Sequence, residues 1–210
     1  MKQPTLPLSF AVLALATLTG VACQSTQSHS KAGHAQEPAA APAMDMAKMM
    51  AEMERLGTPG PEHAALMQDA GAWDNTIKLR MAPDQPWIES TGTVKAHPVL
   101  GGRYLMQEIE GNMMGMPFQG LQLLGYDKLT NEYTAVWGDS MSTWMVTSRG
   151  KEGPKGVFDM RGTMIDVAGQ RPYRMVTTNK SPDERFIVMY DTIPPHGEIV
   201  VMEITSKRRK

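Results

Sequence analysis

Cysteine is almost absent from this chain of 210 residues, in which Cys23 is the only one. No disulfide can therefore form within one copy of the chain, and no zinc site can be built from cysteines. An excess of one charge is also missing, because 21 basic side chains balance 22 acidic ones to a formal net charge of -1. The composition thus disfavours nucleic acid as a partner.

The common short motifs of catalysis and cofactor binding are absent as well. The chain contains no Gly-x-Ser-x-Gly, no His-Glu-x-x-His, no Gly-x-x-x-x-Gly-Lys and no Gly-x-Gly-x-x-Gly that opens a helix. We therefore assign no catalytic residue, no metal site and no cofactor. These absences make an enzyme less expected without excluding one.

The amino-terminal segment has the pattern of an export signal. Lys2 is its only early charge, and Leu8 to Ala22 form an uncharged, largely apolar run of 15 residues. A membrane-spanning helix needs about 20 apolar residues, so this run is too short to remain as an anchor. We expect residues 1–22 to be a signal peptide.

The end of this segment, Thr19-Gly20-Val21-Ala22-Cys23, resembles a bacterial lipobox, although Leu is usual where Gly20 stands. The resemblance implies that Cys23 becomes the lipidated first residue. Gln24 after it is similar to the sorting signal for the outer membrane, which places the expected protein on the periplasmic face of that membrane. Ordinary cleavage that leaves Cys23 as a spare thiol is the alternative.

Residues 23–43 hold no large apolar side chain and are expected to form a disordered tether. Residues 44–70 form a Met-rich helical segment, because apolar side chains recur there at spacings of three and four: Met46, Met49, Met50, Met53 and Leu56. Gly57-Thr58-Pro59 should end this helix, and a second one should begin at Pro61. We expect the methionine face to pack, with binding of Cu(I) as the weaker reading.

From residue 71 onward the pattern is that of an all-β domain. Short runs rich in Thr, Val, Ile, Tyr and Met alternate with turn residues every eight to twelve positions. Period-two alternation is clear where Phe158, Met160 and Met164 share one face of a strand. We count about ten strands and predict an antiparallel up-and-down β-barrel over residues 71–210, which removes exposed sheet edges and can enclose a ligand.

Two sets of residues resemble known families. Gly71-Ala72-Trp73, together with Arg208 beyond the last strand, resembles the calycin signature, in which a basic side chain covers an indole and closes the barrel. More specific segments resemble the bacterial family catalogued as domain of unknown function 1579: Leu100-Gly101-Gly102-Arg103-Tyr104, Met113 to Phe118, Leu124 to Asp127, Trp137 to Met141, and Met202 to Thr205. The resemblance covers residues 62–210 and implies a lipocalin-like barrel in an exported bacterial protein, with no established activity.

Candidate ligand-binding residues follow from strand parity and from the composition of the turns. Trp137, Asp139 and Met141 should point to one face, near Trp144 at the start of the next strand. Further candidates are Arg103 and Tyr104, and a turn that could line an apolar entrance: Met113, Met114 and Met116. The plainer readings are a core Trp137 with Asp139 capping a turn, and an Arg103 that points to solvent.

The residues together favour an envelope lipoprotein whose barrel binds a small apolar or amphiphilic molecule. Its expected contact with the membrane is the lipid at Cys23 alone. The alternatives are an enzyme with a site at the end of the barrel, or a protein that binds Cu(I) or haem, for which His97 and His196 would be the candidate iron ligands.

Overall fold

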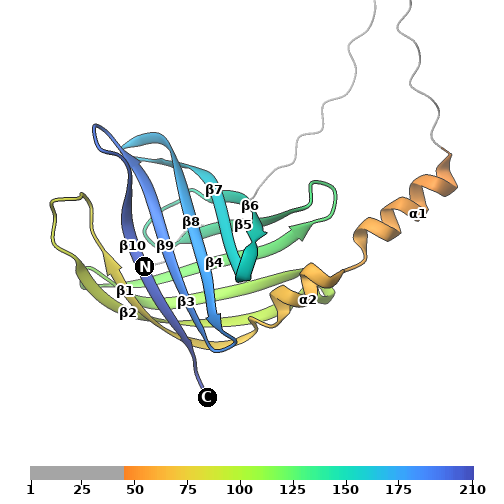
Figure 1. Ribbon diagram of the computed structural model, residues 1–210, viewed down its shortest axis with the longest axis horizontal. Helices are drawn as coiled ribbons and strands as arrows, with labels where there is room; N and C mark the ends of the chain where they lie inside the picture. Colours follow the sequence, from red (N-terminus) through yellow and green to blue (C-terminus); the bar gives the residue numbers. More distant parts are fainter. Residues whose placement is uncertain (1–44) are drawn as a thin grey trace, which may run out of the picture. The chain divides into compact units, whose positions relative to one another are not determined.

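The computed structural model describes residues 45–210, so the predicted signal peptide, Cys23 and the tether lie outside the described residues. Two helices precede ten strands along the chain (Figure 1). The helices are α1 (Met46–Gly57) and α2 (Pro61–Met67). The strands are β1 (Gly71–Leu79), β2 (Ile88–Val99), β3 (Tyr104–Met113), β4 (Met116–Asp127), β5 (Glu132–Asp139), β6 (Val146–Gly153), β7 (Val157–Asp166), β8 (Gly169–Ser181), β9 (Glu184–Ile193) and β10 (Gly197–Arg208).

The strands form a closed antiparallel barrel, which confirms the prediction from sequence. Each strand pairs with the next one along the chain, and β1 pairs with β10 to close the sheet. The register of the closing pair places Trp73 opposite Arg208 and Leu79 opposite Met202. Because every strand has two neighbours, the sheet has no free edge, and alternate side chains point into the interior.

The connections between strands define two ends of the barrel. The loops after β1, β3, β5, β7 and β9 lie at one end, which we call the mouth: residues 80–87, 114–115, 140–145, 167–168 and 194–196. At the other end, the base, lie the remaining turns together with α2, which contacts β3 and β4. Among the described residues no helix covers the mouth.

The base is filled by a small apolar core to which α2 contributes. Leu66 of α2 is buried against inward-facing side chains of the barrel, namely Tyr133, Ala135 and Met160. Tyr133 also makes edge contacts with the rings of Tyr126 and Phe158, with centroids 5.0 Å apart in each pair. The interior is therefore filled next to α2.

Two strand boundaries differ from those expected. Gly111 and Asn112 are residue types that favour a turn, but β3 continues through them to Met113, and the turn is Met114-Gly115. Glycine at position 111 is explained by the close approach of β2 and β3. A Cβ there would lie 3.0 Å from the carbonyl oxygen of Thr91.

The sixth strand also begins later than expected. Trp144 was expected at its start, but residues 140–145 form a loop and β6 begins at Val146. The side chain of Asp139 accepts a hydrogen bond from the backbone N–H of Met141 at 3.0 Å, which turns the chain away from the ladder at this point.

The methionine face of α1 is not packed, contrary to expectation. The helix has no buried residue, and Met46, Met50 and Met53 are each more than three-fifths exposed. Its carboxyl end is held at the base by Lys128, whose Nζ donates to the carbonyl oxygens of Arg55 and Thr58 at 2.5 and 2.9 Å. No helix among the described residues is long and apolar enough to span a bilayer.

Candidate functional site

A cavity of about 370 Å³ lies inside the barrel, and all ten strands contribute side chains to its wall. The wall is mainly apolar, since the inward positions carry aliphatic, aromatic and methionine side chains. Its volume is at the small end of the range of roughly 300–1,000 Å³ typical of ligand pockets. The period-two alternation of the strands thus forms a pocket rather than a filled core.

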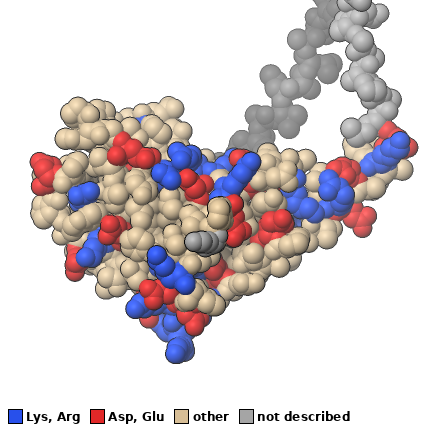
Figure 2. All heavy atoms as spheres, in the orientation of Figure 1, with Lys and Arg blue, Asp and Glu red and all other residues tan. Residues whose placement is uncertain are grey.

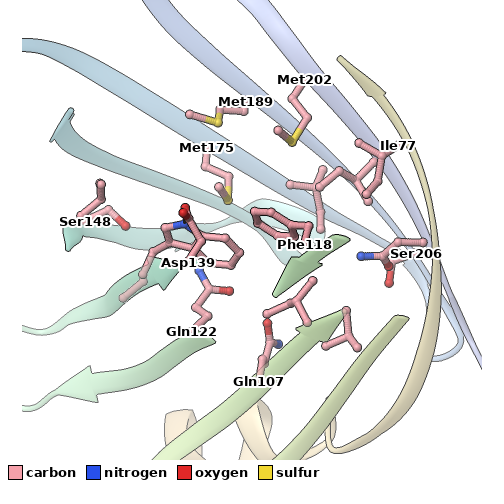
Figure 3. Close-up of a pocket in the computed structure, with 18 of the residues that line it drawn as sticks. Ile77, Gln107, Phe118, Gln122, Asp139, Ser148, Met175, Met189, Met202 and Ser206 are labelled. Carbon is pink, nitrogen blue, oxygen red and sulfur yellow. The ribbon is translucent and has the colours of Figure 1, made fainter. Parts of the chain in front are cut away.

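Methionines form a large part of this wall. Met175, Met189 and Met202 are register partners on the neighbouring strands β8, β9 and β10, and Figure 3 shows them extending into the same space. Met113 and Met141 line the cavity closer to the mouth. Unbranched thioether side chains adapt to ligands of different shape, so this wall is compliant.

An aromatic pair lies between the centre of the cavity and the mouth. The rings of Phe118 and Trp137 stack with centroids 6.2 Å apart and an interplanar angle of 17°. The indole lies over Gly120 of the neighbouring strand, where even a Cβ would collide with the ring. Trp137 Nε1 donates to Asp139 Oδ2 at 2.9 Å, which fixes both side chains. Asp139 is therefore engaged by the indole and by the turn, and it also lines the cavity.

The closure of the base by Trp73 and Arg208 is as the sequence predicted. Trp73 is 2% exposed, and the guanidinium carbon of Arg208 lies 4.2 Å from the centroid of its ring. The structure adds a second cation, because the guanidinium of Arg185 lies 3.7 Å from the same ring. Trp73 Nε1 donates to the carbonyl oxygen of Asp69 at 3.0 Å, so the indole has no unsatisfied polar group.

A row of polar side chains lies next to this closure. Asn75, Ser206 and Arg185 are register partners on β1, β10 and β9, all three are buried, and all three line the cavity. Arg185 Nη1 donates to Asp69 Oδ2 at 2.9 Å. Two atoms of the row, Asn75 Oδ1 and Arg185 Nε, have no hydrogen-bond partner. A buried donor or acceptor without a partner is costly, so this row is the part of the wall most suited to a polar group.

The electrostatics of the row follow from its burial. Loss of solvent raises the pKa of Asp69, although the nearby Arg185 and Arg208 partly oppose the effect. Loss of solvent likewise lowers the pKa of Arg185, with Asp69 opposing and Arg208 adding to the effect. Asp69 and Arg185 compensate each other's charge, so the base end of the cavity is polar without a strong net charge.

The candidate residues chosen from sequence separate into two groups. Trp137, Asp139 and Met141 line the cavity, as their parity suggested, and so does Met113, which was proposed from the composition of its turn. The others lie elsewhere: Arg103, Tyr104, Met114, Met116 and Trp144.

Arg103 and Tyr104 lie on the outer side of the barrel. Both line an open groove there, together with side chains of β4 to β7 and the end of α1. The ring of Tyr104 covers Gly125 on the neighbouring strand, and the guanidinium of Arg103 donates to the carbonyl oxygen of Leu100 at 3.1 Å. Met114, Met116 and Trp144 are exposed at the mouth.

The candidate metal ligands are dispersed as well. His97 and His196 are exposed and do not line the cavity. Among residues 45–210, no three or more His, Cys, Asp and Glu side chains gather in a way that could hold a metal ion. His63 is buried at the base, where its Nδ1 accepts from the N–H of Gly60 at 3.1 Å and its ring contacts Tyr126 edge-on.

The residues that sequence reasoning missed are those whose role depends on closure of the barrel. Asn75 and Ser206 are an ordinary amide and hydroxyl in strands that alternate, and Arg185 follows a turn where an exposed cation is usual. Parity counted from Trp73 would have placed Asn75 inside, since both are odd positions of β1. For Arg185 parity gives no answer, because β9 carries apolar side chains on both faces: Ile187 and Met189 on one, Phe186 and Val188 on the other.

The fold has been seen in solved structures, whose sequences are distant from this one. An S-type phycobiliprotein lyase CPES from Guillardia theta matches with a TM-score of 0.52 and 12% identity, over 75% of this chain and 97% of that one. Rv2717c from M. tuberculosis matches with a TM-score of 0.54 and 12% identity, over 73% of this chain and 100% of that one. At this identity the likeness establishes the fold alone. No curated protein matches the sequence.

The family assignment is based on the sequence itself. Residues 58–208, which include α2 and the whole barrel up to the Arg208 that closes it, match the family described as protein of unknown function (DUF1579). This match confirms the resemblance drawn from the central segments. The chain belongs to the DUF1579 family.

Proposed function

We propose that the barrel binds a small, mainly apolar molecule in its central cavity. The observation that carries this proposal is the cavity itself, about 370 Å³ of space surrounded by apolar and methionine side chains. A solid core would gain dispersion contacts and bury more surface, so a space of this size in a barrel of ten strands suits an occupant.

The polar row at the base suggests the character of that molecule. A ligand with one polar end could approach Asn75, Ser206 and Arg185, while its apolar part lies along Met175, Met189 and Met202. Because Asp69 already compensates the charge of Arg185, a neutral group that both donates and accepts hydrogen bonds fits this end better than an anion. The proposed ligand is therefore an amphiphile with a compact neutral head.

The cellular setting forms part of the proposal. The lipobox-like sequence at Cys23 and the run before it support an envelope lipoprotein on the periplasmic face of the outer membrane. Mass spectrometry of the mature amino terminus from the native host tests this placement. A diacylated Cys23 is expected, and an unmodified thiol there would contradict it.

Ligand binding is tested by filling the cavity at one position. Ile204 lines the cavity and Thr205, its neighbour on β10, points the other way, so Ile204→Trp and Thr205→Trp form a matched pair. Titration with the uncharged dye N-phenyl-1-naphthylamine should show saturable binding to the wild type and to Thr205→Trp, and loss of binding in Ile204→Trp. Native mass spectrometry of the protein from its host should show a co-purifying molecule that Ile204→Trp lacks.

Equal binding of the dye by both variants would refute the cavity as the site. A melting temperature measured for each variant separates this result from unfolding, because a variant that has lost its fold would bind the dye more strongly, at exposed apolar surface.

A further inference from the structure

The mouth of the barrel presents a ring of exposed apolar side chains. Four of its five connections, or the strand ends beside them, contribute: Met81, Met114, Met116, Trp144, Met145 and Val167. Val167 is 99% exposed and Met145 is 71% exposed. Single exposed apolar residues are common on soluble proteins, but several of them at the same end of a barrel that encloses an apolar cavity indicate a contact surface.

Charged side chains are scarce in the same loops. Arg80 and Asp84 are the only Asp, Glu, Lys or Arg residues in the five connections at the mouth. Arg80 is engaged, since its guanidinium lies 4.5 Å from the ring centroid of Trp87 and its Nε donates to the carbonyl oxygen of Val200 at 2.8 Å. In Figure 2 red and blue atoms are sparse over the loop between β9 and β10, at the upper left.

The base differs in charge rather than in apolar exposure. Leu100 and Leu129 are 70% and 75% exposed there. Charged residues lie within three positions of each of them, Arg103 after Leu100 and Lys128 before Leu129. Neither of these two cations takes part in an ion pair of the described residues.

At the mouth, Asp166 beside Val167 is paired with Arg171 at 2.7 Å, and no charged residue lies within three positions of Trp144 or Met145. Burying the apolar side chains of the base would therefore desolvate an unpaired cation, which burying those of the mouth does not require. The mouth is thus the end suited to an apolar medium.

We propose that the mouth docks on the surface of a lipid bilayer, with Trp144, Met145 and Val167 entering the interfacial region. Indole rings favour this zone because one end of the ring is apolar and the other carries a donor. The inference goes beyond ligand binding in the cavity, and it does not require that the cavity ligand be a lipid. It adds a second membrane contact to the lipid expected at Cys23.

The scarcity of charge also defines which bilayer is suitable. The loops of the mouth contain one cation and one acid, so they have no electrostatic preference for anionic lipid. Transfer of apolar side chains from water alone drives the contact. Docking on phosphatidylcholine vesicles should therefore match docking on vesicles with equal parts of phosphatidylcholine and phosphatidylglycerol. It should also survive an increase from about 0.1 M to about 1 M salt, which shortens the Debye length from about 10 Å to about 3 Å.

The experiment must separate docking at the mouth from binding through the amino-terminal apolar run. We use the full chain with Cys23→Ser, and place one environment-sensitive fluorophore either at the mouth (Val167→Cys) or at the base (Leu129→Cys). On phosphatidylcholine vesicles the label at 167 should shift to the blue and be quenched by brominated lipid. The label at 129 should show neither effect, even though both proteins sediment with the vesicles.

A charge introduced at the mouth can be compared with the same charge introduced at the base. Met145→Asp at the mouth and Leu100→Asp at the base alter residues of almost equal exposure. Met145→Asp should abolish the blue shift of the label at 167, and Leu100→Asp should leave it unchanged.

Three results would overturn the proposal. The two labels could respond alike, or the label at 167 could stay in water while the protein is bound to vesicles. The label at 167 could also become buried without vesicles as protein concentration rises, which would identify a second copy of the chain as the occupant of the mouth. Dye binding in the cavity, measured without vesicles, reports separately on the proposed function.

Discussion

Arg208 should contribute far more to the stability of the fold than its position near the end of the chain suggests. Its guanidinium donates to the carbonyl oxygens of Ala70 at 2.6 Å, Gln68 at 2.7 Å and Pro182 at 3.2 Å, and it covers the ring of Trp73. One side chain thus joins the end of α2, the start of β1 and the turn between β8 and β9. The substitution Arg208→Met keeps most of the apolar stem and removes every donor.

The expected cost follows from which of these contacts water can replace. A hydrogen bond from a charged donor is worth roughly 1.5–3 kcal/mol when the acceptor is left without a partner. Only the bond to Ala70 is partly buried, while those to Gln68 and Pro182 are exposed and contribute less. Adding about 0.5–1 kcal/mol for the cation over the indole gives a loss of about 3 kcal/mol. The melting temperature should fall by about 10 °C.

The neighbouring residue offers a matched control. Arg209 pairs with Asp74, and both side chains are about half exposed to solvent, so Arg209→Met should leave the melting temperature almost unchanged. Urea unfolding followed by tryptophan fluorescence measures both variants, and the slope of the transition should stay constant. Equal losses in the two variants would refute the view that Arg208 closes the base through specific hydrogen bonds.

Three further outcomes are expected. Burial lowers the pKa of His63 below its usual 6.5, so the folded protein favours the neutral ring. The stability that this neutral ring contributes is present above pH 6.5 and is lost as the pH falls through the lowered pKa. Urea unfolding from pH 7.5 downward should show this loss of stability in the wild type and a smaller loss in His63→Gln. Equal losses in the two proteins would contradict the assignment to His63. Gly120→Ala should displace Trp137 and shift the intrinsic fluorescence, whereas Gly138→Ala should not, because a Cβ there meets only a Met145 side-chain atom at 3.8 Å. Lys128→Met should remove both anchors of α1 and speed proteolytic cleavage between the two helices, and unchanged cleavage would show that the anchors do not hold the helix.

How far the site could be predicted depended on whether a residue's role is local. Trp137, Asp139 and Met141 were assigned correctly to one face, because alternation along an extended chain needs no knowledge of neighbouring strands. Arg103 and Tyr104 lie outside the cavity because they flank a turn at the base, where β3 begins with an outward side chain. The prediction that the methionine face of α1 packs was wrong for a related reason. Periodicity shows that a helix has an apolar face, but not that another surface of the protein covers it.

The amino-acid sequence alone determined the class of the domain, the number of its strands and the identity of the residues that close it, because turn chemistry and alternation act over a few residues and Trp73 and Arg208 carry a recognisable pattern. Only the tertiary structure decided that Arg185 approaches the same indole, and that Asn75 and Arg185 lie on either side of Ser206 with unpaired polar atoms. Both features bring residues of β1 close to residues of β9 and β10, and this happens only when β1 pairs with β10 and the sheet closes.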